Sequence, residues 1–129
     1  MNRLLRTGFL TGLSAIGGLG VGLAIAQSPA LDPALVAPHI YQVALENEKV
    51  RVLEVTDRNG ETPPLHSHPD RVVVFLSPCA WMVTNDDSSH MESYKFGEVL
   101  WAERETHGGQ TSTVIQECRI LEIELKPPG

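Results

Sequence analysis

Residues 60–69, with the sequence GETPPLHSHP, contain the pattern that decides the fold. Gly60 is followed by five residues and then by His66 and His68, which are separated by a single serine. On a β-strand, side chains two residues apart point to the same face of the sheet. The spacing therefore predicts a strand on which two imidazole rings converge, and imidazole nitrogens are common ligands of transition metals.

A second stretch, residues 97–107 with the sequence GEVLWAERETH, places a glycine, a strand-like segment and a histidine in order. Gly97 opens the segment, and His107 follows it after an expected tight turn. Two histidines on one strand are often only core or surface residues. His107 is a third candidate ligand beside His66 and His68.

These two stretches resemble the two sequence motifs of the cupin superfamily. With residues 47–55 and 118–125, the resemblance covers most of the chain after residue 26. It implies an all-β fold, a single-domain cupin β-barrel of the jelly-roll type. It also implies that His66, His68 and His107 occupy three of the four positions that hold a metal inside the barrel.

The chain departs from the cupin motifs at three positions. The family's glutamate, four residues after the second histidine, is replaced by Val72, and the proline and glycine of the second motif are replaced by Glu103 and Glu105. If the chain stays extended there, Glu103, Glu105 and His107 share one face. One glutamate would then act as a replacement ligand, a general base or an acceptor for a histidine N–H, and Glu105 is the candidate catalytic residue. Two solvated acids on a rim loop are the alternative.

Three neutral imidazoles would leave a bound divalent ion at least one open position. Imidazole accepts Fe, Mn, Ni and Zn, so the sequence does not identify the metal. The first hypothesis is an exported metalloenzyme for a small molecule, dioxygenase-like, or hydratase- or hydrolase-like with zinc. The alternatives are a non-catalytic metal- or ligand-binding module and a structural dimer with incidental histidines. Small cupins often pair, so we expect a homodimer.

From residue 40 onward, apolar and polar residues alternate over short segments separated by turn residues, and after residue 26 no capped helical stretch competes. The segment at 121–125 predicts that Leu121, Ile123 and Leu125 face inward. The continuous apolar run at 72–76 predicts a strand buried on both faces. The expected strands are 41–45, 50–55, 72–76, 81–84, 94–96, 99–102, 111–115 and 120–125.

The first 26 residues have the pattern of a secretory signal peptide. Arg3 and Arg6 precede an uncharged apolar stretch that ends in Ala24-Ile25-Ala26, a small-x-small cleavage site. A retained membrane anchor is the alternative. We expect a signal peptide at 1–26, a Pro-rich arm at 27–39, either a tether or laid across the domain, and the barrel at 40–129. The protein would then be periplasmic or secreted, with no stable membrane insertion after cleavage.

The formal net charge of the whole chain is −6, and removal of the signal segment leaves 8 basic against 16 acidic residues. Nucleic-acid binding depends on Lys and Arg neutralising phosphates, so nucleic acid is not an expected partner. The expected partner is a small-molecule substrate or ligand. Arg71 is expected in a surface ion pair with Asp70 or a neighbouring acid, and His39 and His90 are expected to be exposed.

Cys79 and Cys118 are the only cysteines. An even count in an exported chain permits a disulfide, and two buried free thiols are the alternative.

Overall fold

The computed structural model describes residues 29–128, so the predicted signal segment lies outside the described residues. Two short helical turns come first, and ten strands follow. The elements are η1 (Pro29–Leu31), α1 (Pro33–Val36), β1 (Tyr41–Glu46), β2 (Val50–Asp57), β3 (His66–His68), β4 (Arg71–Phe75), β5 (Cys79–Asn85), β6 (Ser88–Tyr94), β7 (Val99–Ala102), β8 (Glu105–His107), β9 (Ser112–Gln116) and β10 (Cys118–Leu125).

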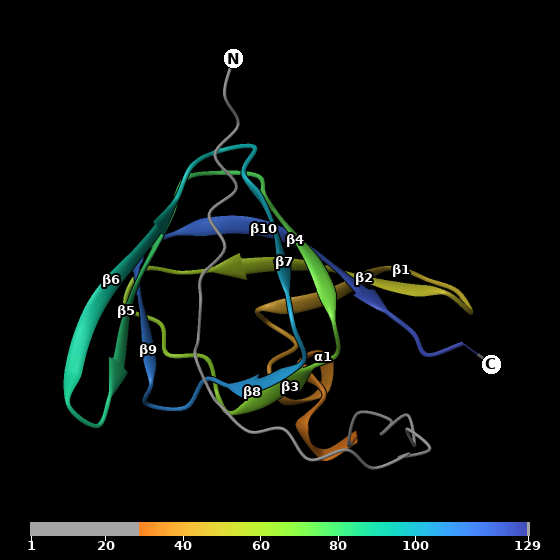
Figure 1. Ribbon diagram of the computed structural model, residues 1–129, viewed down its shortest axis with the longest axis horizontal. Coiled ribbons are helices and arrows are strands. Elements are labelled where there is room, and N and C mark those ends of the chain that lie inside the picture. The colour runs from red at the N-terminus through yellow and green to blue at the C-terminus, as the bar shows by residue number, and fades with distance from the viewer. Residues whose placement is uncertain (1–28, 129) are drawn as a thin grey trace, which may run out of the picture.

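The strands form three antiparallel sheets that enclose one interior. The largest has the order β1-β2-β10-β4-β7, the second has the order β6-β5-β9, and β3 pairs with β8. Figure 1 shows the three-stranded sheet on one side, the five-stranded sheet opposite, and the β3-β8 pair across the end between them. The predicted all-β barrel is confirmed.

A hydrophobic core occupies part of the interior, and its member Tyr41 reaches the β3-β8 pair. It is built from the inward side chains of both larger sheets together with the segment after α1. Its buried members are Ala37, Ile40, Tyr41, Leu53, Val55, Val73, Phe75, Cys79, Cys118 and Ile120.

A short capped helix precedes the barrel, contrary to the expectation of none. Asp32 caps α1 because its side chain accepts a hydrogen bond from the Ala34 N–H at 2.9 Å, and Pro33 occupies the first helical position. The Asp-Pro pair is a typical start signal for a helix, but a helix of four residues is too short to show helical periodicity in the sequence. The turn ends against the barrel, where Ala37 and Ile40 are buried.

Strand β10 has the opposite phase from the one predicted. Ile120, Glu122 and Glu124 are buried inside the barrel, whereas Leu121 and Ile123 are half-buried and Leu125 is exposed. The alternation at 121–125 correctly predicted a strand, but the apolar side chains of Leu121, Ile123 and Leu125 face outward. In β4 the alternation is similar, since Val72 and Val74 are only half-buried, so the prediction of burial on both faces is wrong.

The strand β6 was largely missed by the sequence prediction. His90 was interpreted as part of a polar turn after Ser88-Ser89, yet residues 88–94 form a strand that pairs with β5 over seven positions. Most of β6 is exposed at the edge of its sheet, so its polar side chains carry no alternation of burial to detect.

Cys79 and Cys118 form a disulfide, with their Cα atoms 5.0 Å apart. The bond joins the first residue of β5 to the first residue of β10, and both cysteines are buried. It therefore connects the two larger sheets at one end of the barrel. Among the described residues, no helix has the length and apolar character needed to cross a bilayer.

Candidate metal centre

The pairing of β3 with β8 brings the three predicted histidines together. In this antiparallel pair His66 lies opposite His107, and His68 lies opposite Glu105. The ring centroids are 4.4 Å apart for His66 and His107, 4.8 Å for His66 and His68, and 5.3 Å for His68 and His107. The sequence-predicted cluster therefore exists as one compact group.

Gly108 allows the close approach of these two segments. Its φ of +89° lies in the left-handed region, and a Cβ built there would lie 2.4 Å from the Pro64 carbonyl oxygen and 3.0 Å from His66 Nδ1. Any side chain would push His66 away from the strand that carries His107. The glycine directly after the third histidine is thus part of the site's construction.

The hydrogen bonds of His66 assign its tautomer. Its Nδ1 lies 2.6 Å from the Pro64 carbonyl oxygen, which can only accept, so Nδ1 carries the proton. Its Nε2 is then the acceptor for the Tyr41 hydroxyl at 2.9 Å. Burial, followed by the charges of Glu122 and Asp57, raises the pKa of Tyr41 well above its usual value, so Tyr41 remains a phenol.

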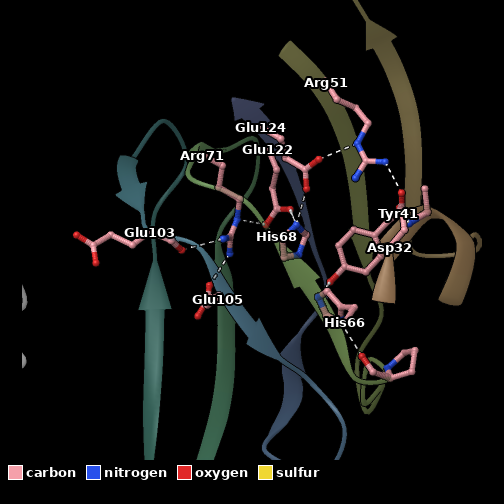
Figure 2. Close-up of polar contacts among 12 residues, drawn as sticks. Asp32, Tyr41, Arg51, His66, His68, Arg71, Glu103, Glu105, Glu122 and Glu124 are labelled. Atoms are coloured by element: carbon pink, nitrogen blue, oxygen red, sulfur yellow. Dashed lines mark hydrogen bonds and ion pairs between the residues drawn. The ribbon is translucent and has the colours of Figure 1, made fainter. Parts of the chain in front are cut away.

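His68 is oriented by two buried carboxylates of β10. Its Nδ1 donates to Glu124 Oε1 at 2.8 Å and lies 3.2 Å from Glu122 Oε2. Carboxylates in this position hold the ring and leave the other nitrogen as a free electron-pair donor. Figure 2 shows both glutamates pointing to the same ring.

Two buried nitrogens in the cluster have no hydrogen-bond partner among the described residues: His68 Nε2 and His107 Nε2. Burial lowers the pKa of His107 to about 3 and also lowers that of His66, so both rings are neutral at pH 7. Potential ligand atoms of the three rings all lie within 4.8 Å of one another. Neutral, buried and convergent imidazoles fit a divalent transition metal.

The structure corrects the prediction for Arg71, which is buried rather than on the surface. Its Nη2 donates to Glu105 at 2.6 Å and its Nε to Glu122 at 3.3 Å. Asp70 instead binds Arg104 at the surface. Arg71 therefore connects β8 to β10 inside the barrel, as Figure 2 shows.

Glu105 lies on the same face of β8 as His107, as the spacing predicted. Burial tends to raise its pKa, but His107 and Arg71 together bring the pKa of Glu105 below its usual value. Glu103 differs because it lies before the strand and contributes only its carbonyl to Arg71, at 3.5 Å. Val72 faces outward, so the position expected for the family's glutamate does not point to the histidines.

A second ion pair ties the N-terminal segment to the site. Arg51 of β2 donates to Glu124 Oε2 at 2.7 Å and to Asp32 Oδ2 at 2.7 Å. The hydrogen bonds to Glu124 and Asp32 outweigh burial and raise the pKa of Arg51. Glu124 is thus held between Arg51 and His68, and these contacts keep its pKa below the usual value despite burial.

A cavity of about 300 Å³ opens beside the histidines. Residues from both larger sheets line it, and at its histidine end lie His66, His107 and Glu105. Aromatic side chains line another part of the wall: Phe75 and Tyr94 are stacked with centroids 4.3 Å apart, and Trp81 lies 5.9 Å from Tyr94.

Several residues of the site were missed by sequence reasoning. They lie on three strands outside the two motifs, β1, β2 and β10, and are Tyr41, Arg51, Asp57, Glu122 and Glu124. Only the alternation of charge in β10 could have indicated two of them, and it was interpreted with the opposite phase. His39 and His90 are exposed as predicted, each beside an acid.

Solved structures similar to this chain share the architecture described above. A cupin domain from Bordetella pertussis Tohama I has 24% identity and a TM-score of 0.53, with 68% of this chain and 93% of that chain covered. A cupin superfamily protein from Desulfitobacterium hafniense DCB-2 has 15% identity and a TM-score of 0.50, with 68% and 77% covered. The polyketide cyclase RemF from Streptomyces resistomycificus has 20% identity and a TM-score of 0.51, with 68% and 66% covered.

A single-domain all-β barrel with a histidine cluster at one end defines the class of this protein, and the chain has the cupin fold. The resemblance noted in the two motifs is thereby confirmed at the level of the fold. No protein-family model and no curated protein matches the sequence.

Strands β2 and β10 are joined by a buried ion pair, Arg51 with Glu124, and by an exposed one, Arg119 with Glu54. A comparison of the two tests the importance of the buried network. Glu124→Ala removes the partner of His68 and of Arg51 inside the barrel, and we expect the free energy of unfolding to fall by about 3 kcal/mol. Glu54→Ala removes the partner of Arg119 on the outer face of the same strands, where both side chains are largely exposed, and should change it by less than about 1 kcal/mol. Urea unfolding at pH 7 measures both. Equal losses would contradict the structural importance of the Glu124 network.

Proposed function

We propose that this protein is a metal-binding cupin that acts on a small molecule in its cavity. The observation that carries the proposal is the pair of buried imidazole nitrogens, Nε2 of His68 and Nε2 of His107, that have no partner among the described residues. In such a buried place an unsatisfied nitrogen is unfavourable unless a ligand completes it. His66, His68 and His107 would hold the ion, and Glu124 and Pro64 would orient two of the rings.

When bound, a divalent ion of the Fe, Mn, Ni or Zn class would supply Lewis acidity, and with a redox-active metal it would supply oxygen chemistry. The chain's own residues supply position and charge. The pairing of Arg71 with Glu105 keeps one carboxylate at the histidine end of the cavity, and the charge of Arg71 favours the ionised form of that carboxylate. Burial at the end of the barrel limits the access of water.

A second candidate function is a non-catalytic metal- or ligand-binding module. The contact that favours it is the same pairing of Arg71 with Glu105, because a carboxylate held by a guanidinium is a weaker base. The first candidate requires Glu105 to exchange this partner for substrate during turnover. The second requires no such exchange.

Metal binding is tested by elemental analysis of the untagged protein. We expect close to one ion per chain in the wild type and a loss of at least tenfold in affinity for His107→Ala, since one of three imidazole donors is removed. His90→Ala, at an exposed histidine on β6, is the matched control and should keep the ion. Equal metal content in both variants would overturn the proposed site.

The role of Glu105 is tested by Glu105→Gln, which keeps the shape of the side chain and removes its charge. If Glu105 is the general base, turnover of a panel of thiols, diketones and hydratable substrates should fall by about 10²-fold or more while metal content stays unchanged. Glu103→Gln, at the neighbouring exposed glutamate, should change neither. A fall in metal content would instead identify Glu105 as a ligand, and no change in turnover would remove it from the catalytic role.

We also propose that the protein is exported and that residues 1–26 are removed as a signal peptide. The basic start, the apolar stretch and the small-x-small site support this, and the disulfide is of the kind that persists in oxidising compartments. The periplasm or the exterior of the cell would be its location.

We propose a homodimer in which two copies pack through the outer face of the five-stranded sheet. One apolar row crosses all five strands in register, consisting of Leu45, Val52, Ile123, Val72 and Trp101. The face measures roughly 24 by 26 Å from strand spacing and length, about 600 Å², which is close to the roughly 800 Å² per partner of a standard interface. Ile123 lies at the middle of the row, so a second copy related by a two-fold axis would place like rows against each other.

Trp101→Glu should convert this dimer to a monomer, because a charge would be buried in an apolar contact. Trp101 is 54% exposed in the single chain, and Met91 on β6 is 61% exposed on the other sheet. Met91→Glu is therefore the matched control and should leave the dimer intact. Light scattering after gel filtration measures the mass, and a monomeric wild type would contradict the proposal.

A further inference from the structure

Asp57 is a buried acid that the proposed metal centre does not use. It is the last residue of β2, it is only 4% exposed, and it lines the same cavity as His66 and His107. Its Oδ2 accepts a hydrogen bond from Trp81 Nε1 at 3.0 Å. Its Oδ1 is buried and has no partner among the described residues.

An unsatisfied oxygen on a buried carboxylate destabilises the folded protein. Burial raises the pKa of Asp57 to about 6, with the Trp81 hydrogen bond lowering it and the charges of Glu122 and Glu61 raising it further. The folded protein therefore keeps the Asp57 carboxylate buried although this lowers the free energy of unfolding. Such groups are characteristic of binding sites rather than of structural cores.

No described cation is placed to satisfy Asp57. Arg71 is the only Arg or Lys among the residues that line the cavity, and its side-chain nitrogens are engaged by Glu105, Glu122 and the carbonyl of Glu103. The Tyr41 hydroxyl is engaged by His66. The missing partner of Asp57 Oδ1 must come from a molecule that enters the cavity.

The charges on the cavity wall decide the chemistry of that molecule. Four acids line it, Asp57, Glu92, Glu105 and Glu122, against the single guanidinium of Arg71. A carboxylate or phosphate placed at Asp57 would lie beside a carboxylate that no described cation pairs, and the two like charges would repel each other. The remaining wall includes the Phe75, Trp81 and Tyr94 rings, which suit a flat apolar body.

We propose that Asp57 binds the hydrogen-bond donor of the substrate, and that the substrate is a small non-anionic molecule with a hydroxyl or amine on an apolar or aromatic body. This inference rests on the proposed function, because it takes the occupant of the cavity to be the substrate of the histidine centre. Asp57 is a binding and specificity residue in this arrangement, at a part of the wall formed by β2 and β5.

The Trp81 indole N–H reports on Asp57 directly, because the two side chains are hydrogen-bonded. The chain has two tryptophans, so a proton–nitrogen NMR spectrum shows two indole signals, and Trp101→Phe assigns them. Trp101 lies on the outer face of the sheet and serves as an internal control. Four probes that share one phenyl ring and differ in the attached group are titrated: benzyl alcohol, benzylamine, benzoate and toluene.

We expect benzyl alcohol and benzylamine to shift the Trp81 signal saturably and leave that of Trp101 in place. Benzoate should bind at least tenfold more weakly, and toluene should bind more weakly than benzyl alcohol. Asp57→Asn keeps the shape and removes the charge, so it should weaken benzylamine by about tenfold. Benzoate binding as tightly as benzyl alcohol, or an unchanged affinity in Asp57→Asn, would overturn the proposal.

A pH titration without any probe confirms that the variant changes the intended group. The Trp81 signal of the wild type should shift with a midpoint near pH 6, and that of Asp57→Asn should not. Glu122 of β10, Glu61 of the loop after β2 and Tyr41 of β1 are the charged or titratable groups whose charges couple to Asp57. Since its pKa is raised on folding, the wild type loses stability as pH rises from near 3.8 to about 6, and Asp57→Asn should lack this loss.

The metal is varied separately, so that failure of this inference is distinguishable from failure of the proposed function. The same titrations are made on protein as purified and after treatment with a chelator. If the wild type binds no metal ion but its Trp81 signal still responds to the probes, the histidine centre is overturned and Asp57 remains a ligand-binding residue. A bound ion with no Trp81 response to any probe would overturn the role of Asp57 alone.

Discussion

The interior of this barrel is governed by the need to pair buried charges. Glu122, Glu124 and Arg71 are each at most 7% exposed, and a lone charge in such surroundings would destabilise the fold by several kcal/mol. Each therefore contacts a group of opposite charge or a histidine within 3.3 Å. The strands β2, β4, β8 and β10 are joined through these contacts as well as through their backbone ladders.

This pairing explains which groups remain available for chemistry. The arginines engage the carboxylates, and one carboxylate engages the Nδ1 of His68, so the opposite nitrogen of that ring is left without a partner. His66 differs, because its Nε2 accepts a hydrogen bond from the Tyr41 hydroxyl and would have to exchange that partner for a bound ion. Among the described residues, the buried side-chain atoms that remain without a hydrogen-bond partner belong to His68, His107, Asp57 and Glu122. The last three residues line the cavity, and the His68 ring lies beside that of His107 at the histidine end.

The sequence predicted the parts of the fold that short-range spacing determines. The spacing of His66 and His68 placed both rings on one face, and the order of the second motif placed His107 within reach, because an antiparallel pair sets opposite residues side by side. The phase of β10 was not predictable in this way. Its two glutamates face inward, where Arg51 and Arg71, about fifty to seventy residues earlier, are their partners. The hydropathy of residues 118–125 alone does not indicate those distant partners.

The same reasoning explains why the sequence placed Arg71 at the surface. An arginine beside an aspartate in a Pro-Asp-Arg turn ordinarily pairs locally, since nearby groups meet without ordering a long loop. Here Asp70 turns to Arg104, and the first inward position of β4 belongs to Arg71. The direction of the side chain is decided by the pleat of the strand, which alternates from Phe75 back through Val73 to Arg71.

A continuous chain of hydrogen bonds runs from the N-terminal segment to the histidines. Asp32 caps α1 with one carboxylate oxygen and binds Arg51 with the other, Arg51 binds Glu124, and Glu124 binds His68. Each member is at least partly buried, so each hydrogen bond is stronger than its equivalent in water. The orientation of the ring therefore depends on a turn that precedes the barrel in sequence. The short segment before β1 is consequently a structural part of the centre, which a boundary drawn at residue 40 would separate from it.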